Sequence, residues 1–547
     1  MENTSKTRGG TAGRQVARAT AGIGFLHVLR LLLGFIAQPL IANRLALAWQ
    51  ADVYTVAQEI INSIWLVFEK VLNPAVLPLF AAALGDENEE RAWRYASTVL
   101  WITLILLLIV APLAAWQMPF IVNIYSQKAG VEQRLYTVAV ARVMLLGLTF
   151  LGISSLTYVI LNGYKRFLAA ALGDTFWKLG IAVAAFYAVR THLSPLDSLN
   201  VLAWGFVAGS VGKLLPHLIA LWKKWRLLHP TIDWRDPLFK KMWLLAIPLI
   251  LGIVISQFRD MYLFRIADDP RIAVEGSRTA LKFSRLIGTS LIQVFPYALS
   301  IGIFPYLADM ARQKDRQPLT DTLLGALRVC GFVFIPLTCI LISTRFDLLR
   351  AVWESGHMTQ QDTLILSLPF VVFSLGLVAF ASEMMLNQTF YAMTNAWTPT
   401  VIGIATSLLW CILATVGLDL SVRNAGTVAL GIAAIAGAET LSKTIKCILM
   451  GIWLRPHLGH IHWKENSLFL VKVLLASLLC GWLAGALAHI LVPNGEIVSR
   501  MVKLKMLLGV SAAGICGVLL FIALCYIMRV NEAREMAKFV KRKIGKN

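Results

Sequence analysis

Long apolar runs alternate with short polar and charged connections along this chain. Clear examples of such runs are 99–115, 329–343 and 506–528. Apolar runs of roughly 18 residues or more are typical of transmembrane helices, whereas strands of a membrane β-barrel show alternating segments of about ten residues. The pattern therefore predicts an all-α integral membrane protein with about 14 transmembrane helices. The expected spans are 20–43, 52–82, 92–118, 134–162, 166–190, 197–223, 238–266, 276–310, 321–344, 361–393, 396–418, 426–453, 466–490 and 503–529.

Composition supports this class, and the placement of charge gives an orientation. The chain is 58% hydrophobic and 15% charged, with a mean hydropathy of +0.69 and a formal net charge of +21. Three segments hold much of the basic excess: an N-terminal tail (Lys6, Arg8, Arg14, Arg18), a central connection (Lys223, Lys224, Arg226, Arg235, Lys240, Lys241) and a C-terminal tail (Arg529, Arg534, Lys538, Lys541, Arg542, Lys543, Lys546). This bias predicts that both termini are cytoplasmic and that anionic membrane lipids are partners. Nucleic acid is not expected, since no aromatic-and-basic binding fold surrounds these charges.

Motifs for enzymatic, metal or disulfide chemistry are weak or missing. The seven cysteines fall in or beside apolar runs without CxxC spacing, so we interpret them as small core residues. His457, His460 and His462 form a weak metal pattern that lacks a neighbouring carboxylate or cysteine, and solvated histidines are the favoured interpretation. No Walker A, HExxH or GxSxG motif occurs. We expect no metal, no cofactor and no catalysis, and an N-terminal tail rather than a cleaved signal peptide.

The chain contains an internal repeat. A segment from 33–35 to 77–80 resembles a later one from 251–253 to 303–307, and a charged loop follows each. Two similar halves around a central cleft are a common transporter plan, with the substrate at the repeat interface. We predict an N-terminal tail (1–19), a first lobe of six helices (20–223), a basic linker (224–237), a second lobe of six helices (238–455), two added helices (456–529) and a basic C-terminal tail (530–547).

Charged residues within apolar spans are functional candidates because a charge at the bilayer centre is costly. They concentrate in the first two helices of each half and in the tenth span: Arg30, Glu59, Glu69, Lys70, Arg259, Asp260, Arg285 and Glu383. Spans three, five, nine and eleven are interpreted as almost free of charge. Guanidinium groups at 30, 259 and 285 would suit a phosphate or diphosphate.

Each candidate also has a structural interpretation. Arg259 and Asp260 can neutralise each other, and Glu69 and Lys70 can lie near a helix end. A purely structural role is less favoured for Arg30 and Arg285.

Prolines within the spans are a second group of candidates. They are Pro39, Pro74, Pro78, Pro296 and Pro305, accompanied by Gly34, Gly288 and Gly302. Proline removes a helical hydrogen bond, so these helices would bend during a change of access. Kinked but static helices are the alternative. Pro74 and Pro296 are the gating candidates, together with Glu59, Glu69, Asp260 and Glu383.

Several stretches resemble the MurJ/MviN family of lipid II flippases in the MOP exporter superfamily. They include Ala51-Asp52-Val53-Tyr54 and Phe283-Ser284-Arg285-Leu286. The others are 30–35, 68–80, 247–257, 302–307, 352–359 and 387–399. The resemblance implies two six-helix lobes plus two C-terminal helices, and alternating access driven by an ion or the membrane potential. It also implies a cationic cavity for a diphosphate-sugar head and a groove near the last two helices for the polyprenyl tail.

The resemblance carries residue roles over to this chain, with departures. It implies that Arg30 and Arg285 match the family's essential cavity arginines, and that Asp52 matches an acid at the turn between the first two helices. We expect Arg30 and Arg285 to contact the diphosphate, with Arg259, Lys70 and Asp52 behind them. The family has an acid where Ser284 stands and another where Gly288 stands. A second arginine of the first helix is replaced near Ala37 or Gln38, and the basic pair of the second helix is apolar around 64–66.

These departures leave the substrate and the coupling ion open. The first hypothesis is a flippase that moves lipid II from the cytoplasmic to the outer leaflet of a bacterial inner membrane. The second is a flippase for an exopolysaccharide or O-antigen lipid-linked oligosaccharide. A MATE-like cation or drug antiporter is less favoured because it would need acidic cavity walls. A scaffold or a membrane glycosyl transferase is least favoured, since the outer connections are short. The sequence leaves the oligomeric state open, and a monomer is plausible.

Overall fold

The fold is helical throughout the part that the computed structural model describes. This part comprises residues 25–85, 89–126, 129–267, 269, 276–311, 313–393, 395, 397–424, 428–493 and 500–535, and no strand occurs in it. The predicted tail 1–19, and the basic residues beyond Glu535, lie outside the described residues. The chain divides into two compact units, Met1–Asp268 and Asp269–Asn547.

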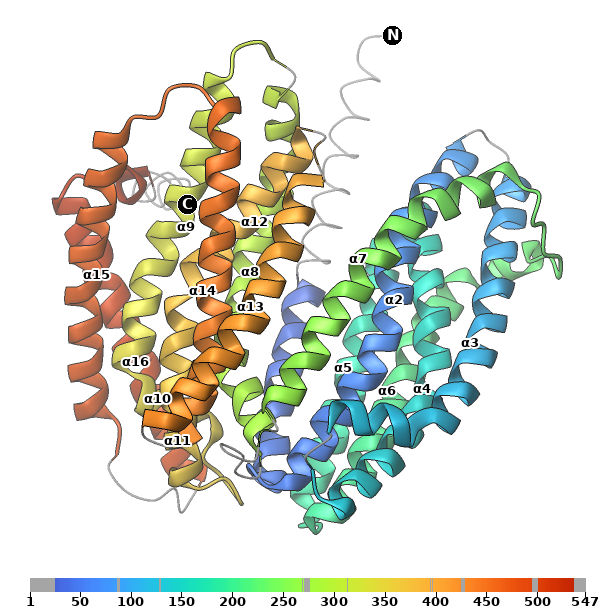
Figure 1. Cartoon of the computed structure of the whole chain (residues 1–547), viewed down its shortest axis with the longest axis horizontal. Helices are drawn as coiled ribbons and strands as arrows, with labels where there is room; N and C mark the ends of the chain where they lie inside the picture. The colour runs from blue at the N-terminus through green and yellow to red at the C-terminus, as the bar shows by residue number, and fades with distance from the viewer. Residues whose placement is uncertain are drawn as a thin grey trace, which may run out of the picture. The chain divides into compact units, whose positions relative to one another are not determined.

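The first unit contains a first helix, Phe25–Leu45, and six further long helices (Figure 1). These are α2 (Trp49–Gly85), α3 (Glu89–Tyr125), α4 (Val131–Gly163), α5 (Phe167–Arg190), α6 (Pro195–Leu221) and α7 (Pro237–Ala267), with a 3-10 turn η1 (Trp222–Leu227) after α6. Helix α4 is the centre of the unit, because α2, α3 and α6 all pack against it. Helix α5 packs mainly on α6.

Helix α7 packs against α2 and α3, so by packing it belongs to the first unit. The sequence predicts that this helix begins the second lobe, at residue 238. Position in a repeat and packing partner are separate properties, because a helix that starts one repeat can pack against the other. The division by packing falls at Asp268–Asp269, and the lobe boundary in the basic linker stays a prediction.

Close contact between α5 and α6 depends on glycine. A Cβ atom placed on Gly180 would lie 2.5 Å from the Cα of Gly209, and one placed on Gly205 would lie 2.2 Å from the Cβ of Ala184. Small residues let membrane helices approach closely, which compensates for the weak hydrophobic force between helices in lipid. This contact fixes α5 against α6, and both helices contribute to the polar cluster described below.

A polar latch at the start of α3 holds the basic connection after α6. Trp93 Nε1 donates to the Tyr164 hydroxyl at 2.7 Å, and that hydroxyl donates to Glu89. Lys224 Nζ of η1 donates to Glu89 Oε1 at 2.5 Å. Burial and the bond to Glu89 raise the pKa of the Tyr164 hydroxyl above its usual value. The latch therefore ties the first basic residues after α6 to the ends of α3 and α4.

The second unit repeats the packing order of the first. It contains α8 (Ser277–Ala311), α9 (Gln317–Ser343), α10 (Arg345–Trp353), α11 (Gln360–Leu375), α12 (Leu377–Ala392), α13 (Trp397–Asn424), α14 (Val428–Leu454), η2 (Arg455–His457), α15 (Trp463–Leu491) and α16 (Arg500–Ile527). Helices α11 and α12 meet at Gly376 and act together as α4 does: α8, α9 and α14 pack against them. Helix α13 packs on α14 as α5 packs on α6. The last two long helices, α15 and α16, pack on each other and on α9.

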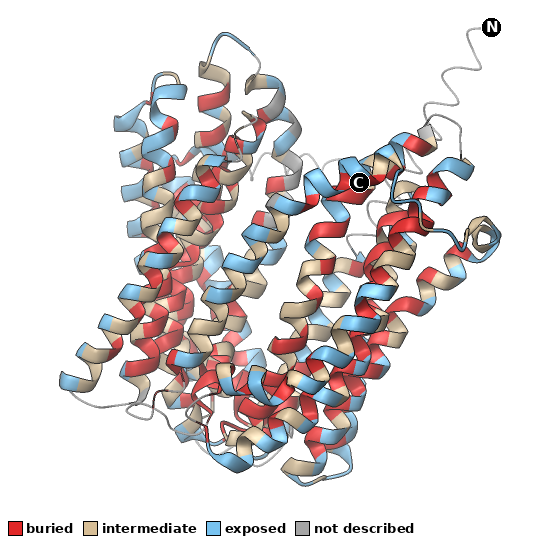
Figure 2. Cartoon of the chain, turned by 45° about the vertical axis from the view of Figure 1, so that its right-hand side comes forward, coloured by how far each residue is buried: buried red, intermediate tan, exposed pale blue. Residues whose placement is uncertain are grey.

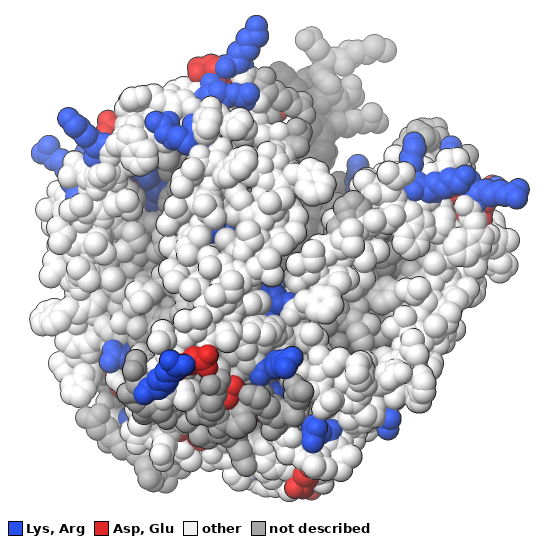
Figure 3. Space-filling model, viewed as in Figure 1, with Lys and Arg blue, Asp and Glu red and all other residues white. Residues whose placement is uncertain are grey.

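Twelve of the described helices, with α11 and α12 counted as one, are long and apolar enough to cross a membrane. Their outward side chains are strongly exposed although they are large and apolar, for example Ile219 at 73%, Leu244 at 76% and Trp482 at 72%. Pale-blue exposed positions run along whole helices (Figure 2). On the face shown in Figure 3, charged side chains gather mainly near the helix ends. Such surfaces are stable only when lipid covers them, so the protein is a multi-pass membrane protein.

Candidate functional site

One carboxylate in the first unit binds two cations. Asp174 of α5 accepts from Arg30 Nη1 at 3.2 Å through Oδ2, and its Oδ1 lies 2.8 Å from Lys213 Nζ of α6. Arg30 also contacts His27 Nδ1 at 3.2 Å. The exposed fraction of the side chain falls from 28% at Arg30 through 16% at Asp174 to 3% at Lys213. The cluster is therefore reached from the Arg30 side and closed at Lys213.

Aromatic rings support this cluster. Lys213 Nζ lies 4.4 Å from the ring centroid of Trp65 and 5.4 Å from that of Trp177. The two indoles meet edge to face at 4.9 Å, and Trp65 Nε1 donates to Ser155 Oγ at 3.0 Å. Ring faces attract cations, and an apolar surround strengthens the ion pair with Asp174. Lys213 is thus held on every side, as a structural counter-ion would be.

The fifth span was wrongly interpreted as almost free of charge, since it contains both Asp174 and Lys178. Lys178 lies one turn after Asp174 on the same face of α5, and its Nζ lies 4.3 Å from the Trp177 ring centroid. The spacing Asp-x-x-x-Lys inside an apolar span is itself the signal that would have found them.

A second buried carboxylate lies in the second unit and also binds two cations. Glu383 of α12 accepts from Lys443 Nζ at 2.7 Å and from Lys446 Nζ at 2.6 Å, both on α14. The Glu383 side chain is 12% exposed. Both of its oxygens are taken by ammonium groups, which makes a role in binding a transported cation unfavourable. Glu383 is among the charges predicted from the sequence, whereas Lys443 and Lys446 are not.

Arg285 pairs with a carboxylate on the same face of α14. Its Nη2 lies 2.9 Å from Glu439 Oε1, and the two side chains are 38% and 9% exposed. Glu439, Lys443 and Lys446 follow at one-turn spacings, so this face of α14 is charged throughout. Arg30 and Arg285 therefore share one property: each is a partly exposed guanidinium held by a more deeply buried acid.

The two positions without the family acids are closed around their present residues. Ser284 is 1% exposed, and its Oγ donates to the carbonyl oxygens of Ala280 at 2.8 Å and Leu366 at 3.2 Å. A Cβ on Gly288 would lie 2.9 Å from Leu377 Cδ2. A carboxylate at position 284 would face the two carbonyl oxygens that now accept from the Ser284 hydroxyl. The surroundings therefore favour serine at 284 and glycine at 288 over acids.

The remaining predicted residues lie on α2 and α7. Arg259 Nη2 lies 2.8 Å from Asp260 Oδ1 on α7, which is the self-neutralising pair that the sequence allowed. Asp52 is buried in the first turn of α2, where the helix dipole favours an acid. Glu59 and Glu69 are half-buried on α2, and Lys70 is exposed there.

The proline candidates leave their helices unbroken. Helix α2 continues through Pro74 and Pro78, and α8 continues through Pro296. Pro74 is exposed and Pro296 is buried. These observations place the prolines within long helices; bending there stays a prediction.

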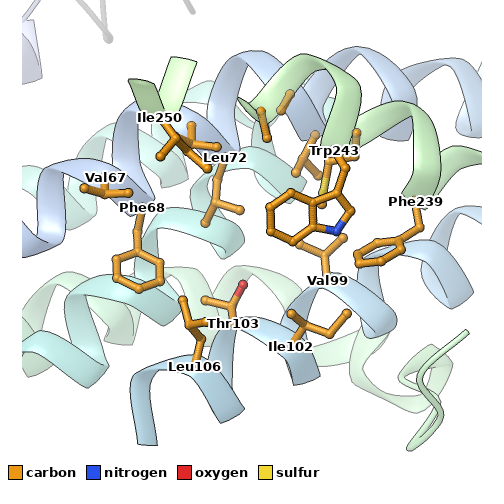
Figure 4. A pocket seen from close by; sticks show the side chains of 15 residues that line it. Val67, Phe68, Leu72, Val99, Ile102, Thr103, Leu106, Phe239, Trp243 and Ile250 are labelled. Carbon is orange, nitrogen blue, oxygen red and sulfur yellow. The ribbon is translucent and has the colours of Figure 1, made fainter. Parts of the chain in front are cut away.

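Apolar cavities lie outside the charged clusters. In Figure 4, Phe68, Trp243 and Phe239 are among the side chains that line a cavity of about 120 Å³ between α2, α3 and α7. Another, of about 400 Å³, lies between α9, the α11–α12 pair and α15. Neither has a charged residue in its lining. Within the described residues no group of three or more metal-ligating side chains was found.

Three comparisons with known proteins agree. Residues 41–539 match the family model described as lipid II flippase MurJ. The curated "Probable lipid II flippase MurJ" of Rhizobium tropici is 26% identical over 411 residues, which cover 72% of this chain and 76% of the relative. A protein of the same name from Rickettsia prowazekii is 22% identical over 93% of this chain and 97% of its own length.

Solved structures show the same fold. A lipid II flippase MurJ in an inward closed conformation aligns with a TM-score of 0.69 at 17% identity, covering 92% of this chain and 98% of that one. An inward-facing multidrug resistance MATE transporter of the MOP superfamily aligns with a TM-score of 0.66 at 15% identity, covering 78% of this chain and 94% of the other.

Proposed function

The chain belongs to the MurJ family of lipid II flippases, and on that premise we propose that this protein moves lipid II from the cytoplasmic to the outer leaflet of a bacterial inner membrane. The observation that carries the proposal is the family match over residues 41–539, which includes most of the described helices. The family is one of transporters, in line with the missing hydrolase and nucleotide-binding motifs.

The proposed membrane arrangement has 14 transmembrane helices, made of two six-helix lobes and two added C-terminal helices. Helices α8 and α14 would be the two further spans beside the twelve candidate spans. Their 35 and 27 residues are enough to cross a bilayer of about 30 Å at 1.5 Å per residue. The basic connection around η1 and the basic tails favour cytoplasmic termini and contact with anionic lipid headgroups.

The proposed contacts for the diphosphate of the substrate are Arg30 and Arg285, with Arg259, Lys70 and Asp52 as secondary candidates. Support comes from the partial exposure of the two guanidiniums and from their charge-assisted bonds to acids. A diphosphate can replace a carboxylate as the partner of arginine, because both offer oxygens in a geometry that the guanidinium fork matches. Both arginines are therefore held in place by an acid before the substrate arrives.

Alternating access between the lobes is the proposed transport mode, driven by an ion or by the membrane potential. Glu59, Glu69, Asp260, Pro74 and Pro296 remain gating candidates. Glu383 fits this role less well, because two lysines already occupy its oxygens.

A second candidate function is a flippase for another polyprenyl-diphosphate glycan, such as an exopolysaccharide or O-antigen unit. The buried hydroxyl of Ser284 and the closed site at Gly288 support it, since the family carries acids at these positions. Loss of two acids would alter what the cavity recognises beyond the diphosphate. The structural likeness to a MATE transporter concerns the fold alone.

Growth rescue tests the proposal. The host's own lipid II flippase would be depleted, and this protein would be expressed as wild type, Arg30→Ala or Arg285→Ala at matched membrane abundance. We expect growth with the wild type and none with either variant. Growth with all three would contradict the arginine assignment, and a folded, inserted wild type that fails to restore growth would favour the second candidate.

A further inference from the structure

The polar cluster of the first unit has more cations than acids. Arg30, Lys178 and Lys213 surround Asp174, and both Asp174 oxygens are engaged, one by Arg30 and one by Lys213. Glu69 of α2 also attracts Lys178 electrostatically but makes no hydrogen bond with it in the structure. Three cations thus face two carboxylates. A surplus positive charge inside an apolar bundle is costly, which makes this cluster a candidate for binding an anion.

Lys178 is the cation of this cluster without an ion pair among the described residues. Lys213 is buried and binds Asp174, and Arg30 binds Asp174 and His27. Lys178 instead lies over the ring of Trp177, half-buried. Its ammonium group has three hydrogen-bond donors. The ring face attracts the positive charge but does not accept these donors as carboxylate oxygens would.

Helical register places Lys178 beside Arg30. Arg30 and Gly34 lie one turn apart on the first helix, and Asp174 and Lys178 lie one turn apart on α5. Arg30 contacts Asp174, and a Cβ on Gly34 would lie 3.6 Å from Lys178 Cδ, so the second pair also face each other. Arg30 and Lys178 therefore lie diagonally across the two helices, one turn apart along them. Two cations placed in this way can bind neighbouring phosphate groups of one diphosphate.

Asp174 and Lys213 then position the two cations without repelling the ligand. The contact of Asp174 with Lys213 is 2.8 Å and that with Arg30 is 3.2 Å, so Asp174 stays paired when Arg30 turns to another anion. The charge of Asp174 is compensated from the buried side by Lys213. A diphosphate therefore meets a net positive site.

We propose that Lys178 is a diphosphate-binding residue that acts with Arg30, and that Asp174 and Lys213 are the positioning residues of this site. The proposal rests on the proposed function for the kind of substrate, a polyprenyl diphosphate. It assigns to α5 a role in recognition in addition to the contact of this helix with α6.

Binding to the purified full-length protein tests this assignment. The probes would be a polyprenyl diphosphate, the polyprenol of equal chain length, and inorganic pyrophosphate, each titrated against wild type, Lys178→Met and Lys178→Arg. Lys464→Met is the matched control, since it removes one exposed lysine from the start of α15. Thermal stability would be measured on the same samples, together with Lys213→Met.

The expected result is that Lys178→Met weakens binding of the polyprenyl diphosphate by about tenfold to a hundredfold, the range for losing a hydrogen bond between charged groups. The substitution should weaken the binding of inorganic pyrophosphate by a similar factor and leave polyprenol binding unchanged. Lys178→Arg should retain most of the affinity for the polyprenyl diphosphate. Lys464→Met should behave as wild type. Weakening for the polyprenyl diphosphate but not for pyrophosphate would restrict the site to the lipid-linked ligand and still support the proposal.

Three results would overturn it. One is wild-type affinity of Lys178→Met for both diphosphates, and another is an equal loss of polyprenol binding. The third is a loss of stability in Lys178→Met as large as in Lys213→Met, which would make Lys178 structural. Growth rescue separates this proposal from the function: a wild type that binds diphosphate through Lys178 but restores no growth would contradict lipid II transport alone.

Discussion

Replacing Glu383 by glutamine tests how the second unit tolerates its buried charges. The substitution keeps the shape of the side chain and removes the negative charge that holds Lys443 and Lys446 at 2.7 and 2.6 Å. Breaking a buried ion pair costs about 3–5 kcal/mol, because the remaining charge stays buried without compensation. The side chains are 12% exposed at Glu383, 13% at Lys446 and 25% at Lys443, so water screens them little. We expect a loss within this range, mostly through Lys446, which is the more buried lysine.

The assay is thermal unfolding of the purified protein in one detergent. A loss of about 3–5 kcal/mol corresponds to a fall in Tm of about 10 °C for a unit of this size. Adding Lys446→Met to Glu383→Gln should restore at least half of the loss, because the more buried of the two uncompensated charges is then gone and only Lys443 remains. Glu465→Gln, which changes an exposed acid at the start of α15, should alter stability by less than about 0.5 kcal/mol. A Tm of Glu383→Gln equal to that of the wild type would contradict the buried-charge explanation, and so would a double variant that is no more stable than the single one.

Other substitutions give further checks. Lys213→Met should destabilise the first unit by about 3–5 kcal/mol and Lys178→Met by less than about 1 kcal/mol, because of the two only Lys213 is ion-paired. Unfolding temperatures that fall equally in the two variants would contradict this. Gly180→Leu should abolish the correctly folded fraction in size-exclusion chromatography, because the α6 backbone lies 2.5 Å from the added Cβ. Gly252→Ala should elute as the wild type does, because nothing lies within 4 Å of its added Cβ. Ser284→Asp should lower stability by about 3 kcal/mol, as it places a carboxylate against two carbonyl oxygens, and an unchanged Tm would show that the site can open.

The sequence is sufficient to predict the class of the fold. Apolar runs such as 99–115 correspond to single helices, because a membrane requires every backbone polar group to be paired within its segment. Charge within a span also identified Arg30, Arg285 and Glu383, all of which lie in buried or partly buried ion pairs. These features are local, so a single chain shows them directly.

Pairing between helices could not be read in the same way. Asp174 lies 144 residues from Arg30, and the sequence has no pattern that joins them. Helix α7 resembles the start of a repeat but packs on α2 and α3, since packing depends on shapes that periodicity does not encode. Lys443 and Lys446 lie inside the predicted span 426–453, and a charge inside an apolar span is the signal that points to both of them.

Exposure of lipid II at the outer face of the membrane would show whether this protein moves lipid II. In cells depleted of their own flippase, the fraction of lipid II cleaved by an enzyme acting only from outside would be measured with this protein as wild type, Arg30→Ala or Arg285→Ala. We expect the wild type to restore the cleaved fraction and both variants to leave lipid II protected at equal membrane abundance. A wild type that is inserted and abundant but leaves lipid II protected would contradict lipid II as the substrate.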